Sequence, residues 1–449
     1  MDTISTKQTT SSAENAAPSA QDPIHSSELP DTSAKEVPPP SSQGLPAFAQ
    51  EVTAVSSDDL ATPALDSHGG GHTFPQDANG IEERRDVYRP GGFHPVYIGD
   101  IYNDRYEVLN KLGYGVYSTV WLVRDRQAQK GESREFLALK VLSAECYGRD
   151  KDVFEREVLI HLRDGDQKEL GYRHVIGETL RTFGAWFPES MIPNRVMRRF
   201  TIQLLVVLDF AHKHNVIHTD IQPSNIFVKV RDHSRVESGY LAEVPIPQLN
   251  RFDEQYTPVP SRPLRKYYFN LTDSIDLFDI ALGDWGVASW ADKHLTDLIQ
   301  PVALRAPEVL IGAPWDATVE MWNLGAIILE LFRAVRMFSG AGPPRGDYQL
   351  KEHLAEIVHH FGPFPQSLLN KANPDIVRDI FDDEGRIKDP TPCAEEISDF
   401  MSEEWTPGLD HDAREEFVFF LRSMMKIDPA ERPSAEDLLR GPWLRALRR

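Results

Sequence analysis

The pattern of apolar and polar positions predicts a small β-rich part followed by a larger helical part. Residues 106–112, 118–124 and 136–142 are rich in aliphatic, aromatic and β-branched side chains, which is typical of strands. Residues 196–212 carry apolar side chains at helical spacing on one face. Residues 319–332 are apolar almost all round, which indicates a helix buried in a large unit. An α+β class is therefore expected.

The composition narrows the class of protein. The chain has 449 residues, and 48 basic against 69 acidic side chains give a formal net charge of −21. This balance argues against general binding to nucleic acids or anionic membranes and favours basic proteins as partners. The two cysteines, Cys146 and Cys393, exclude a disulfide framework, and no apolar run reaches the ~18 residues of a membrane span. We expect a soluble, monomeric intracellular protein in the cytoplasm, the nucleus or both.

Two stretches differ from the rest of the chain. Residues 1–85 are rich in Ser, Thr, Pro and acidic residues, so we expect a disordered tail, with order beginning near Val87. Residues 230–277 separate two predicted strands, and a plain hairpin needs only ~2–5 loop residues, so this stretch is an insertion. Its prolines, which include Pro245 and Pro263, argue against regular structure through its middle.

A glycine-bearing turn joins the first two predicted strands. Gly113 and Gly115 would let backbone N–H groups approach a phosphate without obstruction by Cβ, and Ser118 stands at a third glycine position. A plain hairpin turn is the alternative. A strand, not a helix, follows the turn, which is the context of the protein-kinase loop and not of a dinucleotide fingerprint.

A lysine on the third predicted strand is the next candidate. Lys140 lies among apolar neighbours that include Ala138, and Glu157 on the following helical segment could pair with it. A surface lysine and a solvated helix glutamate are the alternatives. Neither residue is specific by itself.

The most specific motif is His-Thr-Asp-Ile-Gln-Pro-Ser-Asn at residues 218–225. Asp220 could accept the proton of a substrate hydroxyl, and Asn225 could bind a metal held by phosphates. Further along, Asp284 ends a short strand in Asp-Trp-Gly and offers a hard oxygen ligand for Mg²⁺. An ordinary turn is the alternative for Asp-x-Gly. The fixed order of all these elements favours the kinase interpretation.

These motifs resemble those of eukaryotic protein kinases, and within that class those of the SR-protein kinases. The closer resemblance is carried by residues 91–100, 106, 112–115, 118–122, 218–221, 293–294, 299–300 and 308–312. It implies a bilobal protein-kinase fold, ATP and Mg²⁺ as cofactors, and Arg/Ser-rich splicing-type proteins as substrates. The small lobe would span residues 86–176 and the large lobe residues 177–449, and the SR-protein kinases carry a spacer where residues 230–277 stand.

The resemblance also implies residue roles. ATP would be bound by Leu112, Gly113, Gly115, Ser118, Val120, Ala138, Lys140 and Glu157; catalysis would involve Asp220, Gln222 and Asn225, and Mg²⁺ would be held by Asn225 and Asp284. Glu308 and Arg432 would form a buried ion pair that anchors the activation segment. An acidic field for basic substrates would include Asp379, Asp382, Asp383, Glu384, Glu395, Glu396, Glu403 and Glu404, although a solvated acidic surface is the alternative.

Three features depart from the kinase pattern. Thr219 replaces the usual Arg, so we expect no phosphorylation switch in the activation loop. Gln222 replaces a Lys that reaches the transferring phosphate, which could cost on the order of 10²–10³ in rate. Residues 163–192 are too short for strands 4 and 5 and the hinge, so either the gene model is incomplete or the small-lobe sheet is truncated and ATP binding is compromised. The alternatives are a pseudokinase scaffold for basic proteins and, less favoured, a small-molecule phosphotransferase.

Overall fold

The fold is described from a computed structural model of the chain. The described residues are 82–132, 135–146, 154–165, 178–179, 192–229, 234–246, 256–264, 267, 279–333, 337–342, 346–390, 406 and 408–445. Every described residue belongs to one compact unit, Ala64–Arg449. The expected tail therefore lies outside the described residues except at its end. No helix of the described residues is long and apolar enough to cross a membrane.

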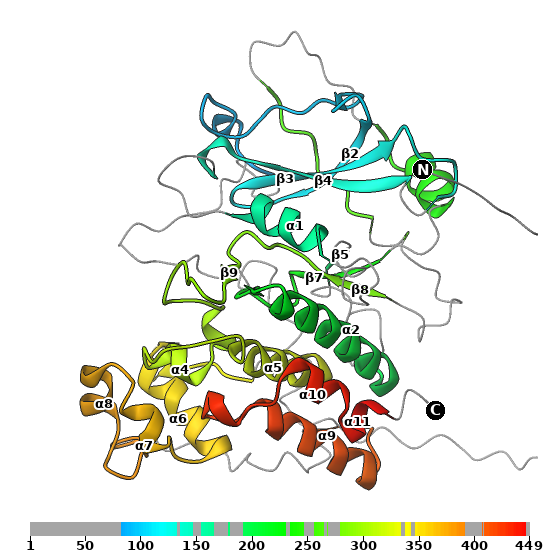
Figure 1. The fold of residues 1–449 in the computed structure, drawn as a ribbon. Coiled ribbons are helices and arrows are strands. Elements are labelled where there is room, and N and C mark those ends of the chain that lie inside the picture. The colour runs from blue at the N-terminus through cyan, green and yellow to red at the C-terminus, as the bar shows by residue number, and fades with distance from the viewer. Residues whose placement is uncertain are drawn as a thin grey trace, which may run out of the picture. The chain divides into compact units, whose positions relative to one another are not determined.

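The small lobe is built on one antiparallel sheet with the strand order β1-β2-β3-β4 (Figure 1). Its strands are β1 Ile101–Tyr102, β2 Tyr106–Tyr114, β3 Ser118–Asp125 and β4 Phe136–Leu142. The three strands expected from the sequence are confirmed. Strand β3 is packed on both faces, because Trp121 and Val123 enter one apolar cluster and Leu122, which points to the opposite face, enters another.

Helix α1, Glu155–Arg163, follows the sheet and lies between it and the helical part of the chain (Figure 1). Val158 and Leu162 of α1 are buried in the same apolar cluster as the large lobe. The helix therefore connects the two lobes through its packing. The structure also begins earlier than expected, because Glu82 and Glu83 are buried, upstream of Val87.

The large lobe is mainly helical. Its helices are α2 Asn194–Lys213, α4 Pro307–Leu310, α5 Val319–Arg333, α6 Leu350–Phe361, α7 Gln366–Leu369, α8 Pro374–Ile380, α9 His411–Met424, α10 Ala435–Leu439 and α11 Pro442–Arg445. The helices expected at residues 196–212 and 319–332 are confirmed as α2 and α5. Short 3₁₀ helices cover Arg85–Val87, Ala144–Cys146, Val302–Leu304 and Pro429–Glu431.

Short strands complete the large lobe. They are β5 Glu178–Thr179, β6 Val216–Ile217, β7 Ile226–Val228, β8 Ile280–Leu282, β9 Ser289–Trp290, β10 Ala341–Gly342 and β11 Asp347–Tyr348. Strand β5 pairs antiparallel with β7, which in turn pairs with β8. The expected loss of strands 4 and 5 and the hinge concerns residues 163–192, most of which lie outside the described residues.

The insertion packs on the small lobe. A π-helical turn, Val236–Tyr240, contributes Val236 and Tyr240 to an apolar cluster with Leu122 of β3. The short helix α3, Leu241–Glu243, follows it, and Leu241 packs against the same cluster. Residues 256–264 form no helix or strand, in line with their prolines. The insertion thus returns from the large lobe to the sheet of the small lobe.

Candidate active site

The β7–β8 hairpin places two candidate metal ligands side by side. Asn225 directly precedes β7, and Asp284 follows β8 after Gly283. The Gly283 N–H donates to the Asn225 carbonyl oxygen at 2.9 Å, which ties the two strand ends together. A Cβ at Gly283 would lie 2.6 Å from the Phe227 ring, so glycine is required for this close approach. Asp284 itself has φ +59°, a strained conformation for a residue with a side chain.

Two amides hold the candidate base, Asp220. The Asn225 Nδ2 donates to Asp220 Oδ2 at 2.7 Å and to the Asp220 carbonyl oxygen at 2.8 Å. The Gln222 Nε2 donates to both carboxylate oxygens of Asp220 at 3.0 Å. Burial raises the pKa of Asp220, whereas the two amide hydrogen bonds act against that rise. The carboxylate is therefore oriented and partly desolvated, as a general base requires.

Hydrogen bonds between backbone and side-chain groups fix the segment that carries Asp220. The Asp220 N–H donates to His218 Nδ1 at 3.3 Å, so the proton of His218 lies on Nε2, which donates to the Gly283 carbonyl at 2.9 Å. The Thr219 N–H donates to Oε1 of the fully buried Glu320 at 2.9 Å, and Oε2 of Glu320 pairs with His212 at 2.6 Å. The position of the candidate base thus depends on α2 and α5.

Thr219, where kinases usually have Arg, makes neutral contacts to the activation segment. Its hydroxyl donates to the Val287 carbonyl at 2.7 Å, and its carbonyl accepts the Gln300 N–H at 3.0 Å. Gln300 in turn accepts the Ala306 N–H at 2.9 Å through its side chain. These contacts of Thr219 and Gln300 are hydrogen bonds between uncharged groups, and none of them needs a phosphate.

Lys140 on β4 pairs with Glu155, and this corrects the expectation that Glu157 would be its partner. The Lys140 Nζ lies 2.9 Å from Glu155 Oε1 and 2.7 Å from Asp284 Oδ1. Glu155 is buried, while Glu157 is exposed on the other side of the first turn of α1. Burial opposes the charge on Lys140, but the two carboxylates outweigh it and raise the pKa of the ammonium.

The glycine-bearing loop leaves room for a ligand. The Gly115 N–H donates to the Ser118 carbonyl at 2.8 Å, which closes the turn between β2 and β3. A Cβ added at Gly113 would meet no atom within 4 Å, and one at Gly115 would meet only the Ser118 hydroxyl, at 3.6 Å. The backbone at both glycines therefore faces open space, as a phosphate cradle requires.

The other candidate nucleotide contacts lie on the same sheet. Val120 pairs with Lys140 in the β3–β4 register, and Ala138 pairs with Leu122. Val120 is half-buried, Ala138 is exposed, and Leu112 packs at the edge of the small-lobe core. Leu112, Val120 and Ala138 thus lie on β2, β3 and β4.

The donor set fits Mg²⁺. Asp284 offers a carboxylate, and because the nitrogen of Asn225 is the hydrogen-bond donor, its amide oxygen is the atom that can coordinate a metal. Hard oxygen ligands of this kind suit Mg²⁺, which usually takes one or two protein ligands together with phosphates and water. Among the described residues, no group of three or more His, Cys, Asp or Glu could hold a metal, so an all-protein cage is not part of this region.

A buried ion pair anchors the segment that follows the site. Glu308 and Arg432 are both fully buried and form two hydrogen bonds, of 2.5 and 2.7 Å, between guanidinium and carboxylate. Arg432 also donates to the carbonyls of Lys426, Thr318 and Ile427 at 2.7–3.2 Å. The ion pair expected from the sequence is confirmed.

Comparison with known proteins agrees with this arrangement. The protein kinase domain family matches residues 271–444. A serine/threonine protein kinase of Aspergillus fumigatus is 32% identical over 81% of this chain and 90% of its own length. The serine/threonine-protein kinase SRPK of Physarum polycephalum is 27% identical over 83% and 93% of the two chains. The crystal structure of a kinase domain matches with a TM-score of 0.53 at 20% identity, over 78% of this chain and 98% of that domain.

The fold is that of a protein kinase, with a small β-rich lobe and a larger helical lobe. The chain belongs to the eukaryotic protein serine/threonine kinases, in the SR-protein kinase-like family.

Two functional residues were missed in the sequence. Glu155 and the predicted Glu157 are both acids in the first turn of the same helix, so the sequence gives no signal that separates them. The signal for Glu320 is weaker, because it is one of two acids, with Glu330, in the mostly apolar residues 319–332. A charged side chain in such a helix is buried with partners, which here are Thr219 and His212.

Proposed function

We propose that this kinase transfers the γ-phosphate of Mg²⁺-bound ATP to serine hydroxyls through the residues assembled around Asp220. The metal, when bound, would neutralise charge that develops on the phosphates. Asn225 and Asp284 would hold it, and Asp220 would accept the proton of the substrate hydroxyl. Lys140, oriented by Glu155, would contact the α- and β-phosphates. The observation that carries this proposal is the chain of contacts from Lys140 through Asp284 to Asn225 and Asp220.

Gln222 favours a second candidate, a scaffold with weak catalysis. A lysine at this position would bring a charge to the transferring phosphate, whereas the Gln222 amide donates to Asp220. The amide nonetheless orients the base, and Lys140, Glu155, Asn225 and Asp284 keep their roles in the site. The kinase is therefore the better supported of the two functions.

We further propose that the substrates are basic and contain serine beside arginine. The chain carries a net charge of −21, and the relative from Physarum polycephalum is named SRPK. Residues 374–386 at α8 and the following turn contain five acids and two arginines, and Asp379, Asp383 and Glu384 are exposed. Such a surface would attract a cationic peptide and raise its association rate, with an effect that weakens as salt is added.

The test is phosphate transfer from ATP to an Arg-Ser repeat peptide by the wild type and by Asp220→Asn. Loss of a general base should lower kcat by ~10²–10⁴, while the melting temperature stays close to that of the wild type. The matched control is Asp209→Asn, an acid on α2 that pairs with Lys213 away from the site. A peptide with the arginines replaced by glutamates tests the substrate class.

Equal kcat for Asp220→Asn and the wild type would contradict the role of the base. Equal kcat/KM for the arginine and glutamate peptides would contradict the substrate class but leave the kinase intact. A wild type that shows no thermal shift with Mg-ATP would favour the scaffold, because a ligand that binds the native state must stabilise it.

A further inference from the structure

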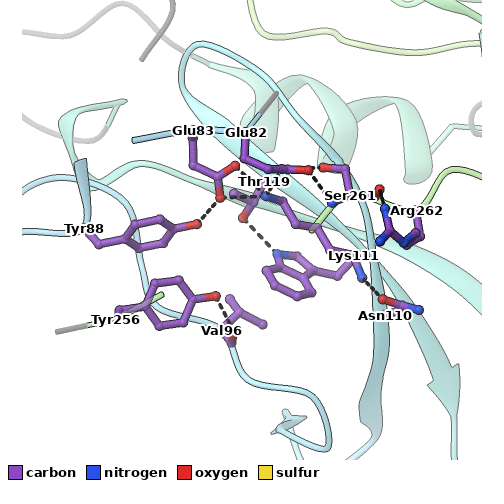
Figure 2. Close-up of polar contacts among 11 residues, drawn as sticks. Glu82, Glu83, Tyr88, Val96, Asn110, Lys111, Thr119, Tyr256, Ser261 and Arg262 are labelled. Atoms are coloured by element: carbon purple, nitrogen blue, oxygen red, sulfur yellow. Dashed lines mark hydrogen bonds and ion pairs between the residues drawn. The ribbon is translucent and has the colours of Figure 1, made fainter. Parts of the chain in front are cut away.

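A fully buried lysine lies at the start of the glycine-bearing loop. Lys111 is on β2, directly before Leu112 and Gly113, and its side chain is 0% exposed. Its Nζ lies 2.9 Å from Glu82 Oε2 and 2.7 and 2.5 Å from the two carboxylate oxygens of Glu83 (Figure 2). Lysine is almost never fully buried without such partners. The reaction itself gives this ammonium no role.

Glu82 and Glu83 together carry one negative charge more than Lys111 neutralises. Neutral hydrogen-bond donors stabilise this remaining charge. Glu82 accepts the Ser261 N–H at 2.5 Å and the Ser261 hydroxyl at 2.8 Å. Glu83 accepts a hydrogen bond from the Tyr88 hydroxyl. Burial, followed by the charge on Glu83, raises the pKa of Tyr88, so this hydroxyl keeps its proton. Each carboxylate thus has a charged and a neutral partner.

Three segments far apart in the chain meet at this cluster (Figure 2). Residues 82–88 supply the carboxylates, β2 supplies Lys111, and residues 256–264 of the insertion supply Ser261. The insertion also reaches the strand by its backbone, because the N–H of the residue after Ser261 donates to the Lys111 carbonyl at 2.9 Å. Two residues before Ser261, Val259 is fully buried in the small-lobe core.

The cluster contacts the loop directly. The Lys111 Nζ lies 5.2 Å from the centre of the Tyr114 ring, and Tyr114 stands between Gly113 and Gly115. A cation over an aromatic face at this distance is attracted by ~0.5–2 kcal/mol. The pairing of β2 with β3 also shifts register between Lys111 and Gly113, so the strand direction changes next to the lysine. The contacts that hold Lys111 therefore determine where the glycine-bearing loop begins.

We propose that Glu82, Glu83, Lys111 and Ser261 form a latch that positions the glycine-bearing loop for nucleotide, with Lys111 as the positioning residue. The proposal rests on the proposed use of ATP. The latch joins the flank before the sheet to the insertion, so both segments act on the affinity for nucleotide through the position of the loop. A purely structural ion cluster would change stability alone, and a positioning cluster also changes the KM for ATP.

The experiment compares Lys111→Met with Lys130→Met in the full chain. Lys130 pairs with Glu237 at 2.8 Å and so also joins the small lobe to the insertion, but it is exposed. Lys111→Met should raise the KM for ATP about tenfold, which corresponds to ~1.4 kcal/mol, while kcat at saturating ATP and the KM for an Arg-Ser peptide stay within about twofold. Lys130→Met should leave all three unchanged.

Further variants keep the proposal testable if Lys111→Met does not fold. Ser261→Ala removes one donor to Glu82 and leaves the charges in place, so it should raise the KM for ATP by about threefold without lowering kcat. A folded Lys111→Met, or Ser261→Ala, with the wild-type KM for ATP would overturn the latch. So would a loss of kcat at unchanged KM.

The failure of the latch and the failure of the proposed function give different results. A wild type without a Mg-ATP thermal shift overturns both. A wild type with such a shift, together with an equal shift in folded Lys111→Met, overturns the latch alone.

Discussion

The two lobes differ in how they build their cores. In the large lobe, α2, α5 and α9 contribute to one continuous cluster that also takes in β7 and β8. The described part of the small lobe has two small clusters instead, and each contains residues of the insertion: Val236, Tyr240 and Leu264 in one, Val259 in the other. The large lobe thus packs its helices on one another, whereas the small-lobe sheet depends on a segment that begins only after α1, α2 and β7.

The buried charges show the same difference. Glu308 and Arg432 face each other within the large lobe, with both side chains fully buried. Lys111 in the small lobe is paired with residues that precede the sheet, and Ser261 of the insertion completes the cluster. The catalytic groups are therefore held by the large lobe, and the nucleotide loop is held by segments from outside its sheet.

The largest expected effect tests the large lobe. Glu308→Gln leaves the Arg432 guanidinium buried without its counter-charge, and breaking one side of a buried pair typically costs ~3–5 kcal/mol. Urea unfolding should show this loss of free energy of unfolding. Glu384→Gln, which removes an exposed pairing with Arg386 at 3.2 Å, should change stability by less than about 1 kcal/mol. Equal losses in the two variants would contradict the importance of the buried pair.

The second prediction concerns the ion pair between β4 and α1. Glu155→Gln should lower kcat/KM by about 10²-fold, because Lys140 loses the carboxylate that orients it and small misplacements of such groups have effects of this size. Glu157→Gln makes the same chemical change two residues further on, where the side chain is exposed. It should retain activity within about threefold, as expected for a surface substitution. A larger loss of kcat/KM in Glu157→Gln than in Glu155→Gln would mean that Glu157 is the partner of Lys140.

The third prediction tests whether the insertion completes the small-lobe core. Val259→Ala removes buried methyl groups and should lower stability by about 2 kcal/mol. Hydrogen exchange should show faster exchange in β2 and β3, with α5 less affected, because local stability follows local packing. Val287→Ala, at a position 48% exposed, is the control. Uniformly faster exchange in both lobes would mean that the cores are not separate.

Local patterns in the sequence predicted the strands and long helices well. Strand β4 has the predicted bounds because an apolar run between turns leaves little choice of ends. The rotation of α1 was not predictable, since two acids two positions apart point ~200° apart and the sequence does not say which side faces the sheet. The prolines showed that the middle of the insertion is irregular but not where it packs.

Long-range contacts were beyond the sequence for a physical reason. Ser261 and Glu82 are separated by 179 positions, and no local pattern encodes which of many acids a serine meets. The order and spacing of Asp220, Asn225 and Asp284 could be recognised because the chemistry requires those residue types in that order. The chemistry does not require particular residue types at the latch, so the latch can be recognised only from the contacts in the structure.

The smallest expected effect concerns the amide that replaces a lysine. The hydrogen bonds from Gln222 stabilise the ionised form of Asp220 and so act to lower its pKa. Only the deprotonated carboxylate can accept a proton, so activity falls as the pH drops through that pKa. Gln222→Ala should raise the pKa and move the acid limb of the kcat profile to higher pH.

The control for this variant is Gln366→Ala, which removes an exposed amide that bonds to the Asp383 carbonyl at 2.8 Å. Its pH profile should match that of the wild type. An acid limb that stays in place in Gln222→Ala, or moves to lower pH, would mean that the amide does not tune Asp220 and acts on the phosphate instead. A shift to higher pH at unchanged melting temperature would show that the Gln222 amide, which belongs to the large lobe, tunes the pKa of Asp220.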